Sequence, residues 1–366
     1  FFLHFKKKYF LQKILGGIMT ENSAILDTMP KLLARNISKF GDSPAFREKD
    51  LGIWQTWTWK ESSEEIQKLS KGLIKLGVQE GDHVAVIGRN RPSLYWSLLA
   101  CQHIGAIPVP LYQDAVAEEM EYILSHCGAS FAIVGDQEQV DKILEISVRL
   151  KGFKDIVFVD PKGLRKYDNK NLHSLTDILE IGSSDSAELD KELNSRVEKV
   201  TGDTTCVLLY TSGTTGKSKG VVQTHRAIIG ASGGANQHDS WTHDDYLLSY
   251  LPMAWVGDFM ISVAQGMGAG ACINCPEGAE TMQVDLREIG PSIFFGPPPL
   301  WERLKTSVFI RIEDAAFFKK AAFNYFMAHA EKVGRDILEK RKVGLFDRMK
   351  YSLGNFLIYA PLKNML

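Results

Sequence analysis

CVLLYTSGTTGKSKGVV, residues 206–222, is the stretch around which this chain is organised. Its first five residues are apolar and β-prone, and a second apolar run follows the small and basic residues, so it predicts a strand, a loop and a second strand. Glycines let backbone N–H groups approach an anion closely, hydroxyls add donors, and lysines add positive charge. The loop therefore predicts a polyphosphate site.

Two other interpretations of this loop are disfavoured. A Walker A loop needs a glycine, four residues and then Gly-Lys-Ser or Gly-Lys-Thr. Gly216-Lys217-Ser218 matches its end, but Thr211 stands where the first glycine is required. Interpretation of the loop as a flexible linker is equally disfavoured, because linkers rarely lie between two apolar β-strand segments.

Composition sets the broad class of the protein. The chain has 366 residues, of which 45% are hydrophobic and 24% charged, so it can bury a large core in two or three lobes. Its net charge of −1 gives no reason to expect a nucleic-acid partner. The five cysteines are scattered through apolar runs, which is typical of reduced thiols in a cytoplasmic protein. No apolar run reaches the length of a membrane span.

The first 18 residues are aromatic and basic, and the first methionine is Met19. One interpretation is an amphipathic anchor or targeting segment. The other, which we prefer, is an upstream region read in frame before a start at Met19. Either way residues 1–18 are expected to lie outside the folded body.

Strand and helix patterns alternate through most of the chain. Hydrophobic periodicity predicts a hairpin within 45–58, and strands alternating with helices predict parallel, doubly wound sheets. The predicted strands are 83–87, 107–111, 131–134, 156–159, 246–251, 271–274 and 292–295. The predicted helices are 29–40, 61–76, 92–104, 117–127, 137–150, 225–237, 258–267 and 281–289, and residues 266–270 are expected to form a tight turn.

These patterns suggest four regions after residue 18. A first α/β subdomain covers 19–160, a charged linker with one surface helix covers 161–200, and a second α/β subdomain covers 201–305. Residues 306–366 form a helical region, in which 311–350 hold ten basic against six acidic residues. An amphipathic helix there either packs on the body of the domain or contacts anionic lipid.

Residues 211–220, read as TSGTTGKxKG, resemble the signature of the adenylate-forming enzymes, which include acyl-CoA synthetases, luciferases and peptide-synthetase adenylation domains. The resemblance covers roughly residues 25–366 and implies stacked, largely parallel α/β sheets. Leu251 to Trp255 resembles a family segment, Leu-Pro-Leu-Ala-His, that lies beside the acyl-adenylate. Trp255 replaces the common histidine, so only a role in shaping the substrate site carries over, and core packing is the alternative.

Residues 295–304, with the helical region after them, resemble the long-chain fatty acyl-CoA synthetase branch. The branch implies a long apolar acid as substrate, with Gly296 and Pro297 among the residues near it. It also implies two steps. The acid attacks the α-phosphate of ATP, and CoA then displaces AMP from the acyl-adenylate.

A carboxylic acid with a pKa of roughly 4 to 5 is already ionised at pH 7. The first step therefore needs placement and neutralisation of charge on pyrophosphate, which an anion nest, lysines and Mg2+ supply. The resemblance assigns Lys219 and Thr211 as catalytic, with Thr211 also a Mg2+ neighbour. It assigns to the nucleotide Thr211, Ser212, Gly213, Thr214, Thr215, Gly216, Lys217, Lys219 and Gly220. For Lys217 a solvated surface position is the alternative, and for His225 we expect helix packing only.

Several family segments are not found before Leu366. They are a Tyr-Gly-x-Thr-Glu segment, a ribose-binding Asp, a hinge Arg and a small domain with the catalytic lysine. We therefore expect the N-terminal portion of a longer enzyme, inactive alone, that works in the cytoplasm with a peripheral contact at the inner membrane face. The alternatives are an adenylating ligase for an aryl or amino acid, and a non-catalytic nucleotide-binding module.

Overall fold

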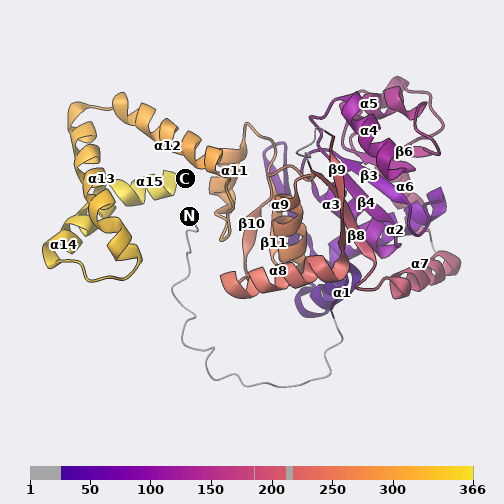
Figure 1. Cartoon of the computed structure of the whole chain (residues 1–366), viewed down its shortest axis with the longest axis horizontal. Helices are drawn as coiled ribbons and strands as arrows, with labels where there is room; N and C mark the ends of the chain where they lie inside the picture. The colour runs from indigo at the N-terminus through magenta and orange to yellow at the C-terminus, as the bar shows by residue number, and fades with distance from the viewer. Residues whose placement is uncertain (1–25, 185, 212–216, 366) are drawn as a thin grey trace, which may run out of the picture. The chain divides into compact units, whose positions relative to one another are not determined.

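The computed structural model describes residues 26–365, except residue 185 and residues 212–216 (Figure 1). The described chain forms two compact units. The larger unit runs to Asp285 and includes Ile289–Ile293, and the smaller unit contains Leu286–Glu288 and the chain from Phe294 onward.

A five-stranded parallel sheet forms one half of the larger unit. Its strands are almost entirely apolar because helices cover a parallel sheet on both faces. In spatial order they are β4 (Ile107–Leu111), β3 (His83–Ile87), β5 (Phe131–Val134), β6 (Asp155–Phe158) and β7 (Leu172–Ser174). The connecting helices include α3 (Pro92–His103), α4 (Ala117–Cys127) and α5 (Gln137–Ser147). This α/β arrangement with parallel strands confirms the predicted fold class.

A second, four-stranded sheet brings together distant parts of the chain. Its order is β10 (Tyr246–Leu248), β11 (Cys272–Cys275), β1 (Pro44–Asp50) and β2 (Ile53–Thr58). The predicted hairpin is present as β1 and β2, but β1 pairs in parallel with β11, with Phe46 opposite Ile273. The N-terminal hairpin thus belongs to the sheet of the later α/β segment. The strand predicted at 292–295 is reduced to a bridge between Ile293 and Leu247.

The chain from 161 to 200 was predicted as a charged linker with one surface helix. It contains a short 3-10 helix (Leu164–Lys166), strand β7, helix α6 (Leu175–Ser183) and helix α7 (Ala187–Lys199). Helix α6 packs closely on α2 (Trp59–Leu76), because Leu175 and Ile178 are buried. The charged residues that suggested a linker lie on the outer faces of these helices, most of them exposed.

Local signals set the helix ends. Helix α2 begins with a capping box between Thr58 and Glu61 and ends at Gly77, whose φ of 99° suits glycine. Helix α1 (Met29–Phe40) starts after the N-cap Thr28. The run predicted as helix at 258–267 is continuous through α9 (Val256–Asp258), a π-helix (Phe259–Gln265) and α10 (Gly266–Ala269). The turn predicted at 266–270 is confined to Gly270, since the preceding four residues are helical.

The smaller unit is helical, as predicted for 306–366. It contains α12 (Pro298–Glu313), α13 (Phe317–Leu338), α14 (Leu345–Gly354), a π-helix (Asn355–Tyr359) and α15 (Ala360–Met365), and α11 (Met282–Ile289) lies where the two units divide. Phe309 packs edge-on against Phe323, with their ring centroids 5.7 Å apart. In the described part of the chain, no helix combines the length and apolar character needed to cross a membrane.

Candidate functional site

The predicted phosphate loop joins the two strands of an antiparallel hairpin. Strand β8 (Thr205–Thr211) pairs with β9 (Lys219–Thr224), and Thr211 lies opposite Lys219 where the strands end. Both side chains are exposed, so a hydroxyl and an ammonium group stand together at the mouth of the loop. Gly220 is opposite Tyr210, and a Cβ on Gly220 would lie 3.2 Å from the tyrosine ring. The predictions for Ser212, Gly213, Thr214, Thr215 and Gly216 concern residues outside the described part of the chain.

Helix α4 contacts both arms of this hairpin. The Tyr210 hydroxyl is hydrogen bonded to His126 Nδ1 at 2.6 Å. The Tyr122 hydroxyl donates to the Ser218 carbonyl at 3.1 Å, and Lys217 Nζ lies 5.4 Å from the Tyr122 ring centroid. Burial raises the pKa of Tyr210, so its phenol stays protonated and polar. Sequence reasoning missed Tyr122 and His126, although their spacing places them on one helix face.

Trp255 is half-buried at the start of α9. Its backbone N–H donates to the Pro252 carbonyl at 2.9 Å, and its indole covers Gly257. A Cβ on Gly257 would lie 2.0 Å from the ring, so only glycine leaves the indole in this position. The structure thus explains how Trp255 is placed, while its contact with substrate stays a prediction.

A buried carboxylate next to this segment was not predicted. Asp258 is 1% exposed and accepts hydrogen bonds from Tyr95 at 2.7 Å and Ser262 at 2.8 Å. Ser249 donates to it at 3.1 Å and Asn90 at 3.3 Å. Burial raises the pKa of Asp258 to about 7, although these bonds work in the opposite direction.

The same group joins the parallel sheet to the Trp255 segment. Asn90 follows β3, and its amide also donates to the Leu251 carbonyl at 2.8 Å. Tyr95 lies on α3 and is hydrogen bonded to Ser249 as well. The chain from Ser249 to Asp258 is therefore held at both ends by side chains from the loop after β3 and from α3.

Gly296 and Pro297 belong to the smaller unit and directly precede α12, with Pro297 at its N-cap. The Trp301 indole donates to the Gly296 carbonyl at 2.7 Å, and a Cβ on Gly296 would lie 2.9 Å from Leu300 and Trp301. Glycine is therefore required for local packing, and contact of these two residues with a substrate stays a prediction.

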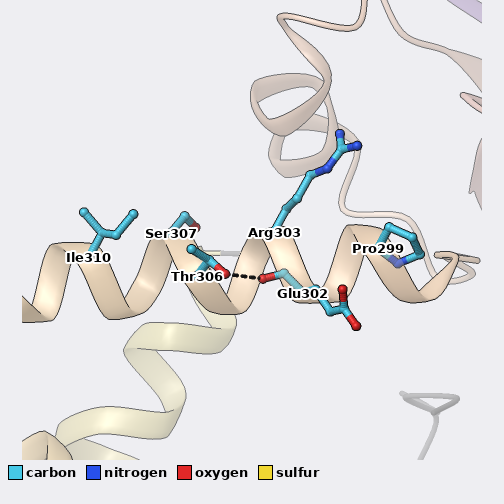
Figure 2. Close-up of a pocket in the computed structure, with 6 residues that line it drawn as sticks. All are labelled: Pro299, Glu302, Arg303, Thr306, Ser307 and Ile310. Carbon is cyan, nitrogen blue, oxygen red and sulfur yellow. Dashed lines mark hydrogen bonds between the residues drawn. The ribbon is translucent and has the colours of Figure 1, made fainter.

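A hollow of about 450 Å³ lies along α12, lined by the six side chains drawn in Figure 2: Pro299, Glu302, Arg303, Thr306, Ser307 and Ile310. All six side chains come from one helix, and the hydrogen bond drawn between the Thr306 hydroxyl and the Glu302 carbonyl is 2.8 Å long. A groove on a single helix surface does not enclose a ligand.

The remaining polar candidates have structural surroundings. His225 is buried at the start of α8 (His225–Asp239), its Nδ1 accepts from the Met29 N–H at 3.3 Å, and burial lowers its pKa to about 4. Cys272 and Cys275 lie in the buried strand β11. Across the described residues, no group of three or more His, Cys, Asp or Glu side chains could hold a metal ion. The exposed Thr211 hydroxyl still suits Mg2+, which uses few protein ligands when substrate phosphates supply the others.

The chain is similar to known proteins over most of its length. The family described as AMP-binding enzyme matches residues 33–346. Human long-chain-fatty-acid–CoA ligase ACSBG2 is 27% identical over 345 residues, covering 93% of this chain and 50% of the human protein. The Mus musculus protein of that name is 29% identical and is 51% covered. The chain thus spans about half the length of the curated relatives it matches. Acetoacetyl-CoA synthetase from Streptomyces lividans has a similar fold, with a TM-score of 0.62 at 19% identity, over 73% of this chain and 42% of that one.

Proposed function

We propose a function from the premise that this chain belongs to the AMP-binding enzyme family. In this proposal the chain forms the ATP-binding part of a ligase that activates a long-chain fatty acid. The observation that carries the proposal is the β8–β9 hairpin, which sets Thr211 opposite Lys219 at the ends of a glycine- and threonine-rich loop. The relatives named as long-chain-fatty-acid–CoA ligases support the choice of acid.

In the proposed first step, the loop residues bind the β- and γ-phosphates while the fatty-acid carboxylate attacks the α-phosphate. Lys219 and Lys217 offset the negative charge that grows on the leaving pyrophosphate. In this proposal the Thr211 hydroxyl would contact a bound Mg2+, which would neutralise phosphate charge. CoA then displaces AMP in the second step. We propose that the acyl group lies beside Trp255, and the role of Gly296 and Pro297 in substrate binding stays a separate prediction.

The nucleotide part of this proposal is tested by equilibrium binding of Mg-ATP. Replacing Lys219 and Thr211 together with alanine removes a cation and a hydroxyl from the phosphates, and each such contact contributes roughly 1.5 to 3 kcal/mol. We expect the dissociation constant to rise at least about a hundredfold. Lys60→Ala, at an exposed lysine of α2, is the matched control and should leave binding unchanged. Undiminished binding by the double variant would overturn the proposal.

The reaction is tested by measuring AMP formation with CoA and acids of graded chain length, for this chain and for the longer product wherever the reading frame continues. A preference for long apolar acids supports the proposed ligase. A preference for aryl or amino acids would indicate a different adenylating ligase. ATP binding without AMP formation from any acid would indicate a nucleotide-binding module.

We also propose that the protein works in the cytoplasm and touches the inner face of a membrane through residues 311–350. The support is their ten basic against six acidic residues, together with exposed aromatic side chains such as Phe317 and Phe318, which are 78% and 83% exposed. Basic residues near an anionic surface each contribute about 1 kcal/mol to such contacts.

A further inference from the structure

We infer that Tyr122 and His126 of α4 are positioning residues that hold the two ends of the phosphate loop for ATP. The inference rests on the proposed function, because the loop is taken to bind the nucleotide. It adds two residues from a different part of the chain, and these residues need not touch the nucleotide.

The hairpin needs support from outside itself. Strands β8 and β9 pair only with each other among the described strands. A two-stranded hairpin is marginally stable alone. The apolar residues of β8 are buried, but Lys219, Val221 and Val222 of β9 are exposed. The arm that returns from the loop is thus the more weakly held.

Helix α4 supplies this support from one face. Tyr122 and His126 are four residues apart, so both point toward the same side of the helix. Their rings lie 5.7 Å apart and are inclined by 32°. His126 holds the arm that enters the loop through Tyr210, and Tyr122 holds the arm that leaves it through the Ser218 carbonyl.

Holding both arms fixes the separation of the loop ends before a nucleotide arrives. Less ordering then has to occur during binding, which strengthens affinity without a new contact to the ligand. The Tyr122 ring also retains the Lys217 ammonium near the loop through a cation–π contact of 5.4 Å.

A purely structural role for α4 predicts a different result. In that case Tyr122→Phe would lower thermal stability and leave the affinity of the folded protein for ATP unchanged. A positioning role instead changes affinity and hairpin dynamics while the melting temperature stays near that of a matched control. Tyr167→Phe is that control, because it removes a hydroxyl hydrogen bonded to Asp141 and Gln137, away from the hairpin.

The experiment measures Mg-ATP binding by calorimetry and hydrogen exchange of residues 217–224 without nucleotide, using the 366-residue chain. Tyr122→Phe should raise the dissociation constant about fivefold, as expected for one lost hydrogen bond, and speed exchange in 217–224. His126→Ala should act in the same direction, and His126→Asn, whose amide can replace Nδ1, should restore most of the loss. Tyr167→Phe should change neither quantity.

The outcomes separate the two proposals. In one outcome the double variant at Lys219 and Thr211 binds ATP weakly, while the Tyr122 and His126 variants show normal binding and exchange. That outcome would overturn this inference and leave the proposed function standing. Absence of Mg-ATP binding by the unaltered chain would overturn the proposed function and this inference with it.

Discussion

Asp258 shows how burial controls the chemistry of a single residue. In the described chain, the groups that donate hydrogen bonds to its carboxylate are neutral hydroxyls and an amide. Neutral donors do not fully replace the water that an ionised carboxylate loses, so protonation is favoured and the pKa rises to about 7. Charge on this group therefore changes near neutral pH, beside the segment that carries Trp255.

The sign of the pH dependence follows from proton binding. Between about pH 4 and 7 the folded protein binds a proton at Asp258 that the unfolded chain has lost, so this group makes stability fall as pH rises, by up to about 4 kcal/mol. Buried His103 and His225, whose pKa values are lowered to about 4, act oppositely, making stability rise with pH up to about 6.5. Only a variant at Asp258 isolates the first effect.

We expect Asp258→Asn to lose the falling contribution, because asparagine does not titrate. Urea unfolding at each pH measures the free energy of unfolding of both proteins. The value for the unaltered protein minus the value for the variant should decrease from pH 5 to pH 8. Asn194→Ala, at an exposed residue of α7 that carries no titratable group, should show a flat difference. A difference independent of pH for Asp258→Asn would contradict the assignment.

At the scale of elements, two glycines allow helices α2 and α6 to touch through their backbones. A Cβ on Gly72 would lie 2.2 Å from the Ile178 carbonyl oxygen, and one on Gly182 would lie 1.8 Å from the Lys68 carbonyl oxygen. Because the obstructing atoms are backbone atoms, no side-chain rotation relieves such an overlap. This close contact is what attaches the region predicted as a linker to the core.

Gly72→Ala should therefore destabilise the protein by about 1 to 3 kcal/mol, the usual range for overpacking, although alanine favours helix formation. Gly230→Ala is the matched control, since Gly230 is also inside a helix but has nothing within 4 Å of an added Cβ. It should be neutral or stabilise by up to about 1 kcal/mol. Urea unfolding midpoints measure both, and equal shifts in the same direction would refute the packing argument.

At the scale of the whole molecule, charge is distributed unevenly along the chain. The totals of 43 basic and 44 acidic residues nearly cancel, yet 311–350 hold ten basic against six acidic residues. Several exposed apolar side chains lie in the same stretch, among them Phe346 at 86% exposure. Basic and aromatic groups together match the chemistry of an anionic lipid surface.

We expect the chain to sediment with phosphatidylcholine vesicles that contain about one third phosphatidylserine, and to be released by salt as electrostatic contacts are screened. Replacing Phe317 and Phe318 with serine should weaken this binding several-fold. Val148→Ser, at an equally exposed apolar residue of the larger unit, should not. Equal sedimentation with neutral vesicles, or none with either kind, would rule out the proposed contact.

Much of the fold could be predicted because its signals are local. Helix α2 has its capping box and terminal glycine within its own sequence, and β8 and β9 flank a recognisable loop. The pairing of β1 with β11 carried no such signal, because it depends on which edges meet after distant segments have folded. Strand β7 was missed for a related reason, since its three residues are only half-buried and show no apolar alternation.

The residues of the candidate site also differ in how far their sequence signals are local. Thr211, Lys219 and the loop between them are contiguous, so glycines, hydroxyls and lysines in one short run are the basis for predicting a phosphate site, which stays a prediction. The Asp258 group draws on residues from Asn90 to Ser262, and the support from α4 joins Tyr122 to Ser218. Hydrophobic periodicity and turn-forming residues involve neighbours in the sequence, so they can be recognised from the sequence alone. The buried carboxylate and the contacts of α4 with the hairpin depend on segments that are distant in the sequence. These segments meet, and exclude water, only in the folded protein, so the tertiary structure was needed to reveal both features.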